Sequence, residues 1–152
     1  MKIIFLDIDG VMNSEVYHKT LDTKKKNWRR FDPDAVKIIK RLVEEYEAKI
    51  VISSLWRFVA KKELATELKE TGLINHLHID WKTPIIEPGH RGKEIKLWLA
   101  NHTEIKEFVI LDDDSDVLEM FDDEFVRTDY YDGLQAEHYF KAREVFDAKK
   151  LE

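Results

Sequence analysis

Short apolar runs alternate along this chain with longer amphipathic segments, and the alternation predicts its secondary structure. Runs rich in Ile, Val, Leu and Phe have the composition of buried strands, and they lie at residues 2–7, 49–53, 77–80, 108–111 and 125–128. Apolar residues at helical spacing predict helices at 33–46, 59–71, 92–100 and 134–148. Strands that alternate with helices indicate an α/β fold in three layers, with a mainly parallel sheet of five strands.

Two of the predicted helices carry specific local expectations. The first has Asp32 as its N-cap, Pro33 at the first helical position, and Phe31 placed to pack against Val36. The last helix is expected to turn one stripe of side chains toward the core, namely Ala136, Tyr139, Phe140, Arg143 and Phe146.

The composition favours a single folded domain over residues 1–152. Apolar residues make up 43% and charged residues 37% of the chain, which is long enough for a substantial core. The absence of cysteine excludes disulfides and thiolate chemistry, and it fits a cytoplasmic location. Acids interrupt the first apolar run after residue 6, and no stretch approaches the ~20 apolar residues of a membrane span. We therefore expect neither a signal peptide nor a membrane partner.

Four aspartates sit at the ends of two predicted strands. Asp7 and Asp9 are at the end of the first strand, and Asp112 and Asp113 are at the end of the fourth. Ligands of open parallel sheets bind beyond the carboxyl ends of the strands, so these carboxylates converge if the two strands are neighbours. Clustered carboxylates require a compensating cation, and ligands that are all oxygen favour Mg²⁺. We predict that either Asp112 or Asp113 ligates the metal directly, with Asp116 orienting the ligands.

The segment Asp7-Ile8-Asp9-Gly10 has a spacing suited to phosphoryl transfer. Residues two apart on a regular strand point to the same face. Gly10 allows a sharp turn and leaves backbone N–H groups open to an anion. Asp7, beside the metal, would act as an ionised nucleophile, and Asp9, slightly off the metal, would pass a proton to the leaving oxygen. The alternative is an ordinary turn with two solvated acids.

Three further segments supply candidate contacts to a substrate phosphate. The Ser53 hydroxyl directly follows a predicted buried strand and can donate to a phosphoryl oxygen, and Ser54 is a further candidate contact to the substrate. The alternative, which the serine pair taken alone favours, is the start of a turn before the next helix. Arg57 could contact the phosphate or form a surface salt bridge. A cation at the start of a predicted helix, either Arg91 or Lys93, would neutralise the phosphoryl oxygens.

In this order, the motifs resemble the haloacid dehalogenase (HAD) superfamily of phosphohydrolases. The resemblance depends on Asp7-x-Asp9-Gly10-Val11, strand-terminal Ser53, a basic residue at a helix start, and Asp112-Asp113. It implies a Rossmann-like domain in which an aspartyl-phosphate forms on Asp7 and Asp9 is the general acid and base. It also implies that Mg²⁺ is held by Asp7, the Asp9 backbone carbonyl and one acid of the Asp112-Asp113 pair. In this superfamily, an acid two residues after the nucleophile marks phosphate transfer to water.

The spacing between the motifs leaves no room for a large cap domain. The small insertion at about 13–31 leaves an open site. Finer details resemble the HAD domains of "Swiss army knife" RNA-repair proteins, namely Phe31-Asp32-Pro33, Ile52-Ser53-Ser54-Leu55-Trp56-Arg57, Arg91-Gly92-x-Glu94-Ile95 and Gly133-Leu134. This resemblance implies phosphate removal at nucleic-acid ends. The expected substrate is therefore a phosphorylated one such as a nucleotide or an RNA or DNA end, and the residues alone leave sugar phosphates and phosphoproteins open.

A basic run at 24–30 lies inside the insertion, in a chain whose net charge is −6. It could steer a polyanion toward the metal, and Trp28 could stack on a base or pack the loop onto the body. We therefore expect a Mg²⁺-dependent phosphomonoester hydrolase. The alternatives are a receiver-like domain and a non-catalytic module that binds Mg²⁺ or phosphate. A receiver would need its acceptor Asp after a middle strand and a Lys after a late one, where this chain has Ser53 and Arg127-Thr128.

Overall fold

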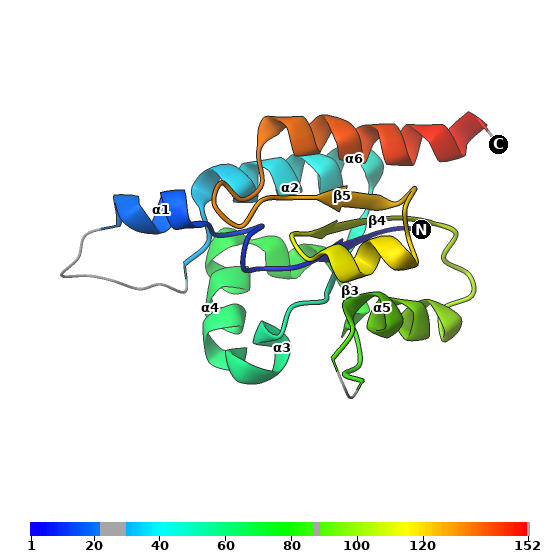
Figure 1. Ribbon diagram of the computed structural model, residues 1–152, viewed down its shortest axis with the longest axis horizontal. Helices are drawn as coiled ribbons and strands as arrows, with labels where there is room; N and C mark the ends of the chain where they lie inside the picture. The colour runs from blue at the N-terminus through cyan, green and yellow to red at the C-terminus, as the bar shows by residue number, and fades with distance from the viewer. Residues whose placement is uncertain (22–29, 87–88, 152) are drawn as a thin grey trace.

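The computed structural model describes residues 1–21, 30–86 and 89–151, and it has a five-stranded sheet between two layers of helices (Figure 1). The strands are β1 (Lys2–Leu6), β2 (Lys49–Ile52), β3 (Leu77–Lys82), β4 (Glu107–Asp112) and β5 (Phe125–Arg127). The α-helices are α1 (Glu15–Thr20), α2 (Pro33–Tyr46), α3 (Trp56–Val59), α4 (Lys61–Thr71), α5 (Arg91–Ala100) and α6 (Ala136–Ala148). Short 3₁₀ helices are η2 (Leu73–His76), η3 (Ser115–Glu119) and η4 (Lys149–Leu151). The predicted α/β fold is confirmed.

The sheet has the strand order β3-β2-β1-β4-β5, and all its strand pairs are parallel. Leu6, the last residue of β1, is paired with Ile52 of β2 on one side and with Leu111 of β4 on the other. The Asp7 N–H donates to the Leu111 carbonyl, and the Ser53 N–H donates to the Leu6 carbonyl, both over 3.0 Å. The prediction that the first and fourth strands are neighbours is confirmed, so the residues that follow them meet at one edge of the sheet.

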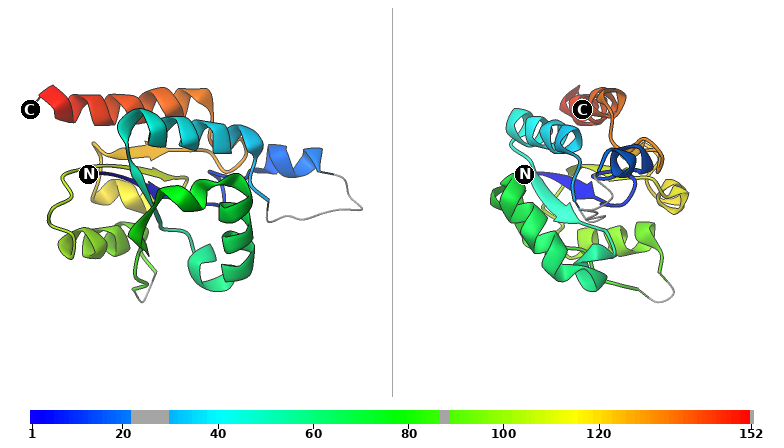
Figure 2. Two further views of the ribbon diagram at one scale, coloured as in Figure 1. Left: turned by 180° about the vertical axis from the view of Figure 1, so that it is seen from behind. Right: turned by 90° about the vertical axis from the view of Figure 1, so that its left-hand side faces the viewer.

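Helices cover both faces of the sheet, which explains why the strands read as continuous apolar runs. The side chains of β1 alternate between the two faces. Ile4 and Leu6 belong to a core cluster shared with α2, α4 and α6, whereas Ile3 and Phe5 belong to a cluster shared with α5. Figure 2 shows α2 and α6 on one side of the sheet and α5 on the opposite side.

The start of α2 agrees with the sequence prediction. The Asp32 side chain accepts a hydrogen bond from the Asp34 N–H over 2.9 Å, and Pro33 is the first residue of the helix. Phe31 and Val36 are both buried in the same core cluster. The local sequence alone was sufficient here because a cap, a proline and a hydrophobic pair all act within one helical turn.

The predicted stripe on the last helix is partly wrong. Tyr139 and Phe146 are buried, but Ala136 and Phe140 are exposed, and Ala142 occupies the buried position between the two aromatic residues. The buried positions 139, 142 and 146 follow one another by three and four residues, which is the spacing of a single helix face. Phe140 lies one residue away from that face, on the solvent side.

An additional short helix, α3, was not predicted. It occupies Trp56–Val59, directly after the end of β2, and Ala60 separates it from α4. The predicted helix at 59–71 is therefore α4, which begins at Lys61. The extra turn matters because it places Trp56 and Arg57 next to the strand ends.

The predicted insertion at 13–31 contains α1, which Ser14 caps by accepting the Tyr17 N–H over 3.1 Å. In the described part of this segment, the regular secondary structure consists of this six-residue helix, and no large cap domain is formed there. Most of the basic run, with Trp28, lies outside the described residues. Arg30 is described, and its guanidinium nitrogens lie 3.9 Å from a Glu67 oxygen and 3.8 Å from a Glu70 oxygen. None of the described helices has the length and apolar character needed to cross a membrane.

Candidate active site

Three aspartates meet beyond the carboxyl ends of the two central strands. Asp7 follows β1, Asp112 is the last residue of β4, and Asp113 comes next. One carboxylate oxygen of each lies within 4.8 Å of the others. Asp7 and Asp112 are buried, and Asp113 is half-buried. We call these residues the acid group. The structure thus brings together three of the four aspartates that the sequence singled out.

The acid group fits a divalent cation. Burial and the neighbouring Asp7 carboxylate hold the pKa of Asp112 well above its ordinary value, although Arg91 acts in the opposite direction. The same two causes raise the pKa of Asp113 to about 6. A raised pKa means that the ionised carboxylate is destabilised, so the group has too little positive charge around it. Its donors are all oxygen, which suits a hard cation.

Arg91, rather than Lys93, is the cation that contacts the acid group. Its Nη1 lies 3.1 Å from Oδ1 of Asp7 and 3.3 Å from Oδ2 of Asp112. Burial lowers the pKa of Arg91, but the two carboxylates outweigh that effect and raise the pKa overall. The Arg91 N–H also donates to Asp116 over 2.9 Å, so Asp116 positions the start of α5. Lys93 is exposed.

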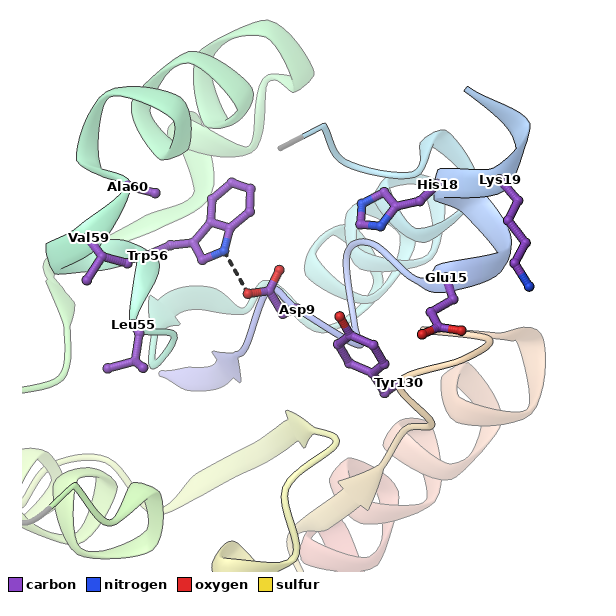
Figure 3. Close-up of a pocket in the computed structure, with 9 residues that line it drawn as sticks. All are labelled: Asp9, Glu15, His18, Lys19, Leu55, Trp56, Val59, Ala60 and Tyr130. Atoms are coloured by element: carbon purple, nitrogen blue, oxygen red, sulfur yellow. Dashed lines mark hydrogen bonds between the residues drawn. The ribbon is translucent and has the colours of Figure 1, made fainter. Parts of the chain in front are cut away.

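Asp9 is not one of the acid group. The expectation that Asp7 and Asp9 point to the same face applies to a regular strand, but β1 ends at Leu6, so Asp9 lies in the turn that follows the strand. Nδ2 of Asn13 donates to its Oδ1 over 2.9 Å, and Nε1 of Trp56 donates to its Oδ2 over 3.0 Å (Figure 3). The exposed carboxylate is therefore held off the acid group, as a proton donor requires. The metal contact implied for the Asp9 carbonyl stays a prediction.

Gly10 is a turn residue whose missing side chain makes room for the acid group. Its φ is 81°, and an added Cβ would lie 2.5 Å from Oδ2 of Asp113. Its N–H donates to Oδ1 of Asn13 over 3.2 Å, and its carbonyl accepts the Thr128 hydroxyl over 2.6 Å. The Gly10 N–H is therefore not one of the backbone donors available to a substrate anion, because the turn itself uses it.

The two serines after β2 have different environments, although both are buried. Oγ of Ser54 accepts the Trp56 N–H over 3.2 Å, so this hydroxyl helps to start α3, as the turn alternative requires. Its predicted substrate contact does not fit this placement. Oγ of Ser53 has no hydrogen-bond partner among the described residues. Ser53 and Asp7 directly follow Ile52 and Leu6, which pair with each other in the sheet, so the two residues lie side by side. Because buried hydroxyls normally have hydrogen-bond partners, the Ser53 hydroxyl is a candidate for binding a ligand oxygen.

Arg57 is a buried structural residue, so both of its predicted roles, a substrate contact and a surface salt bridge, are wrong. Its side chain is fully buried and its Nη2 lies 2.9 Å from Oε2 of Glu94. It also donates to the carbonyl oxygens of Ser53 (2.8 Å), Thr83 (2.9 Å) and Pro84 (3.1 Å). These bonds join the end of β2 to α5, the helix that carries Arg91. Arg57 therefore positions the site without facing a substrate.

Sequence reasoning missed several residues that hold the site. Asn13 lies four residues after Asp9 across a glycine turn, and an asparagine at such a position is a local signal that could have been used. Trp56 lies 47 residues from Asp9, and Thr128 lies 118 residues from Gly10. No pattern in the sequence links such distant positions, because only the sheet order brings them together.

The comparisons with known proteins agree with this geometry. An all-parallel sheet with flanking helices and clustered aspartates beyond its central strands defines a Rossmann-like protein of the HAD type. The family model described as the HAD domain in Swiss Army Knife RNA repair proteins matches residues 3–139, and the chain belongs to this family. Membership indicates a hydrolase or phosphatase of the HAD type in general. Comparisons with curated proteins and with solved structures gave no match.

Proposed function

We propose that this chain is a Mg²⁺-dependent phosphomonoester hydrolase that acts through an aspartyl-phosphate on Asp7. The observation that carries the proposal is the charge balance of the acid group. Three carboxylates from neighbouring strands lie within 4.8 Å of one another, and Arg91 is the cation that the described residues place against two of them. A divalent cation would compensate the remaining negative charge of this group. The same cation would polarise a phosphoryl group that binds there.

Asp7, Asp113 and the Asp9 carbonyl would hold the metal. Both oxygens of Asp112 are already engaged, one with the Asp114 N–H over 2.9 Å and the other with Arg91. Asp113 is more accessible, so we assign it the direct contact and give Asp112 the role of orienting Arg91. When bound, Mg²⁺ neutralises the carboxylates and polarises the phosphoryl oxygens. Ser53 and Arg91 would donate to the same oxygens.

The reaction would proceed in two displacements. In the first, an Asp7 carboxylate oxygen forms a bond to phosphorus, the bond from phosphorus to the ester oxygen breaks, and Asp9 gives its proton to the departing alkoxide. In the second, the Asp9 carboxylate takes a proton from water as the water oxygen bonds to phosphorus. The bond from phosphorus to the Asp7 oxygen then breaks, which releases inorganic phosphate and restores both aspartates. Asn13 and Trp56 keep Asp9 in position for both transfers.

The geometry supports this function over a receiver-like domain. Asp7 follows β1, the first strand along the chain rather than a middle one, and the cation comes from helix α5 rather than from the end of a late strand. A non-catalytic module would need an acid group but no positioned proton donor. Asp9, however, has both carboxylate oxygens held by side chains from separate segments.

The test is hydrolysis of p-nitrophenyl phosphate with Mg²⁺, after chelation of the metal, and by the Asp7→Asn variant. We expect Mg²⁺-dependent release of phosphate by the natural chain and none by Asp7→Asn. Asp123→Asn is the matched control, because it makes the same change at an exposed residue outside the site. Mass spectrometry of acid-quenched protein should find the phosphoryl group on the peptide that contains Asp7. Full hydrolysis by Asp7→Asn, or hydrolysis unaffected by chelation, would contradict the proposal.

A further inference from the structure

Glu94 is a buried acid that the proposed reaction does not use. It lies on α5, three residues after Arg91, and is 3% exposed. Its Oε1 accepts the Ile86 N–H over 3.2 Å, and its Oε2 lies 2.9 Å from Nη2 of Arg57 and 4.0 Å from Nε of Arg91. A buried carboxylate needs partners of this kind. Glu94 therefore faces two guanidinium groups, one on the structural residue Arg57 and one on the cation of the candidate site.

Carboxylates hold Arg91 at two of its nitrogens. Nη1 contacts Asp7 and Asp112 at 3.1 and 3.3 Å, whereas Nε faces Glu94. The distance of 4.0 Å to Glu94 is too long for a hydrogen bond, so this second hold is an attraction between charges. Because the guanidinium group is planar, two such holds fix its direction. The direction of Nη1 therefore depends on Glu94 as well as on the acid group.

The charge of Glu94 also separates two arginines. Burial lowers the pKa of Arg57, Glu94 acts against burial, and the charge of Arg91 lowers the pKa further. The two guanidinium groups thus repel each other, and Glu94 offsets the repulsion. Arg57 is fully buried and donates to three carbonyl oxygens, whereas 14% of the Arg91 side chain is exposed. If the Glu94 charge were lost, Arg91 would therefore be the group that moves.

This hold on Arg91 matters most when a metal is bound, and this step depends on the proposed function. The carboxylates that hold Nη1 belong to the acid group, and a bound cation compensates their charge and weakens their attraction for Arg91. Glu94 is not one of the acid group, so its own attraction for Arg91 remains. We propose that Glu94 is a positioning residue, which keeps Arg91 turned toward the phosphoryl site by attracting its Nε. Glu94 itself would touch no substrate atom.

The first test is phosphate binding by Glu94→Gln, which keeps the length of the side chain and an acceptor for the Ile86 N–H but removes the charge. With Mg²⁺ present, isothermal titration calorimetry measures the dissociation constant of inorganic phosphate, and steady-state kinetics measure KM and kcat for p-nitrophenyl phosphate. We expect the dissociation constant and KM to rise about tenfold, the size of one coupling between neighbouring charged residues. The value of kcat should fall less, because the nucleophile and the proton donor are unchanged.

Glu67→Gln is the matched control. Glu67 is a buried glutamate of α4 that accepts the Phe31 N–H over 3.0 Å and faces Arg30 at 3.9 Å, so the substitution removes the same charge outside the site. It should leave phosphate binding unchanged. If Glu94→Gln alone does not fold, because Arg57 is left unpaired, the comparison is made between Arg57→Met and Arg57→Met with Glu94→Gln. Phosphate binding that the loss of Glu94 leaves unchanged in a folded chain would overturn the assignment.

The second test asks whether Glu94 acts through Arg91. A lysine side chain has one nitrogen and cannot be held at two, so Glu94→Gln should not weaken phosphate binding further in an Arg91→Lys chain. A further tenfold loss in that chain would show that Glu94 supports the fold in general, and would overturn the assignment. Weaker binding by Glu94→Gln in a protein that hydrolyses no phosphate ester would refute the proposed function and support the role of Glu94. Hydrolysis with unchanged phosphate binding would refute that role alone.

Discussion

Two groups of buried charges, both joined to α5, show how differently a protein can treat charge inside its fold. In the first, Arg57 faces Glu94 at 2.9 Å, and backbone carbonyls accept the other guanidinium hydrogens. In the second, Asp7, Asp112 and Asp113 gather around Arg91. In the first group one carboxylate has two guanidinium partners, since Nε of Arg91 also lies 4.0 Å from the Glu94 oxygen, whereas in the second group three carboxylates share Arg91.

The comparison teaches that charge balance, rather than burial, separates a structural group from a functional one. Each guanidinium nitrogen of Arg57 already donates to Glu94 or to a backbone carbonyl, so none is left to bind a ligand. Burial, and then the neighbouring Asp7 carboxylate, raise the pKa values of Asp112 and Asp113, although Arg91 acts against this at Asp112. A group of this kind costs stability in the free protein, and a bound cation recovers it. Four measurements test this difference between the two groups.

The largest effect is expected from Asp7→Asn. It should lower kcat by about 10⁴-fold or more, because the nucleophile is lost. It should leave the free energy of unfolding of the metal-free protein unchanged or higher, because one of three repelling charges is removed. Urea denaturation with a chelator present measures the second quantity. If Asp7→Asn lowered the free energy of unfolding as much as Arg57→Met does, the acid group would have a structural role like that of Arg57.

Arg57→Met should lower the free energy of unfolding by about 3–5 kcal/mol, because Glu94 is left buried without its partner. Replacing both residues, as Arg57→Met with Glu94→Leu, should recover part of that loss. Lys150→Met is the control: this lysine pairs with Asp147 at the surface, and its loss should change stability by about 1 kcal/mol or less. Equal effects of the two single substitutions, measured by denaturant unfolding, would refute the structural role of Arg57.

Mg²⁺ should stabilise the natural chain by about 2.7 kcal/mol at 100 times its dissociation constant, since it binds the folded state alone. Thermal unfolding with and without Mg²⁺ measures this shift. Asp113→Asn should weaken the stabilisation, and Asp123→Asn should not, because only Asp113 belongs to the acid group. Stabilisation that persists in Asp113→Asn would place the metal elsewhere.

The smallest effect is expected at the two serines after β2, of which Ser54 has a structural role and Ser53 a proposed role in binding the substrate. Ser54→Ala should cost about 1 kcal/mol of stability, because the Trp56 N–H at the start of α3 loses its acceptor. Ser53→Ala should cost no stability, since the described residues leave its hydroxyl without a partner, yet it should raise KM for phosphate esters. Denaturant unfolding and steady-state kinetics measure the two effects. A loss of stability in Ser53→Ala together with a raised KM in Ser54→Ala would show that the two roles are assigned the wrong way round.

Local patterns were sufficient to predict most of the fold and the identity of the principal acids. The strands, the start of α2 and the placement of Asp7, Asp112 and Asp113 follow from apolar runs and the residues that end them. The errors have physical causes. Phe140 was assigned to the core because it lies four residues after Ala136, at helical spacing, and Arg57 to the surface because arginine is usually exposed.

Strand and helix periodicity and capping act over a few residues, so they were enough to predict an α/β domain with acids at its strand ends. The contact of those acids with Arg91 rather than Lys93, the hydrogen bond from Trp56 to Asp9, and the pocket beside Asp9 (Figure 3) could not be predicted in this way. Those contacts join residues dozens of positions apart. They depend on strand order and on the direction of each side chain, which no local pattern encodes.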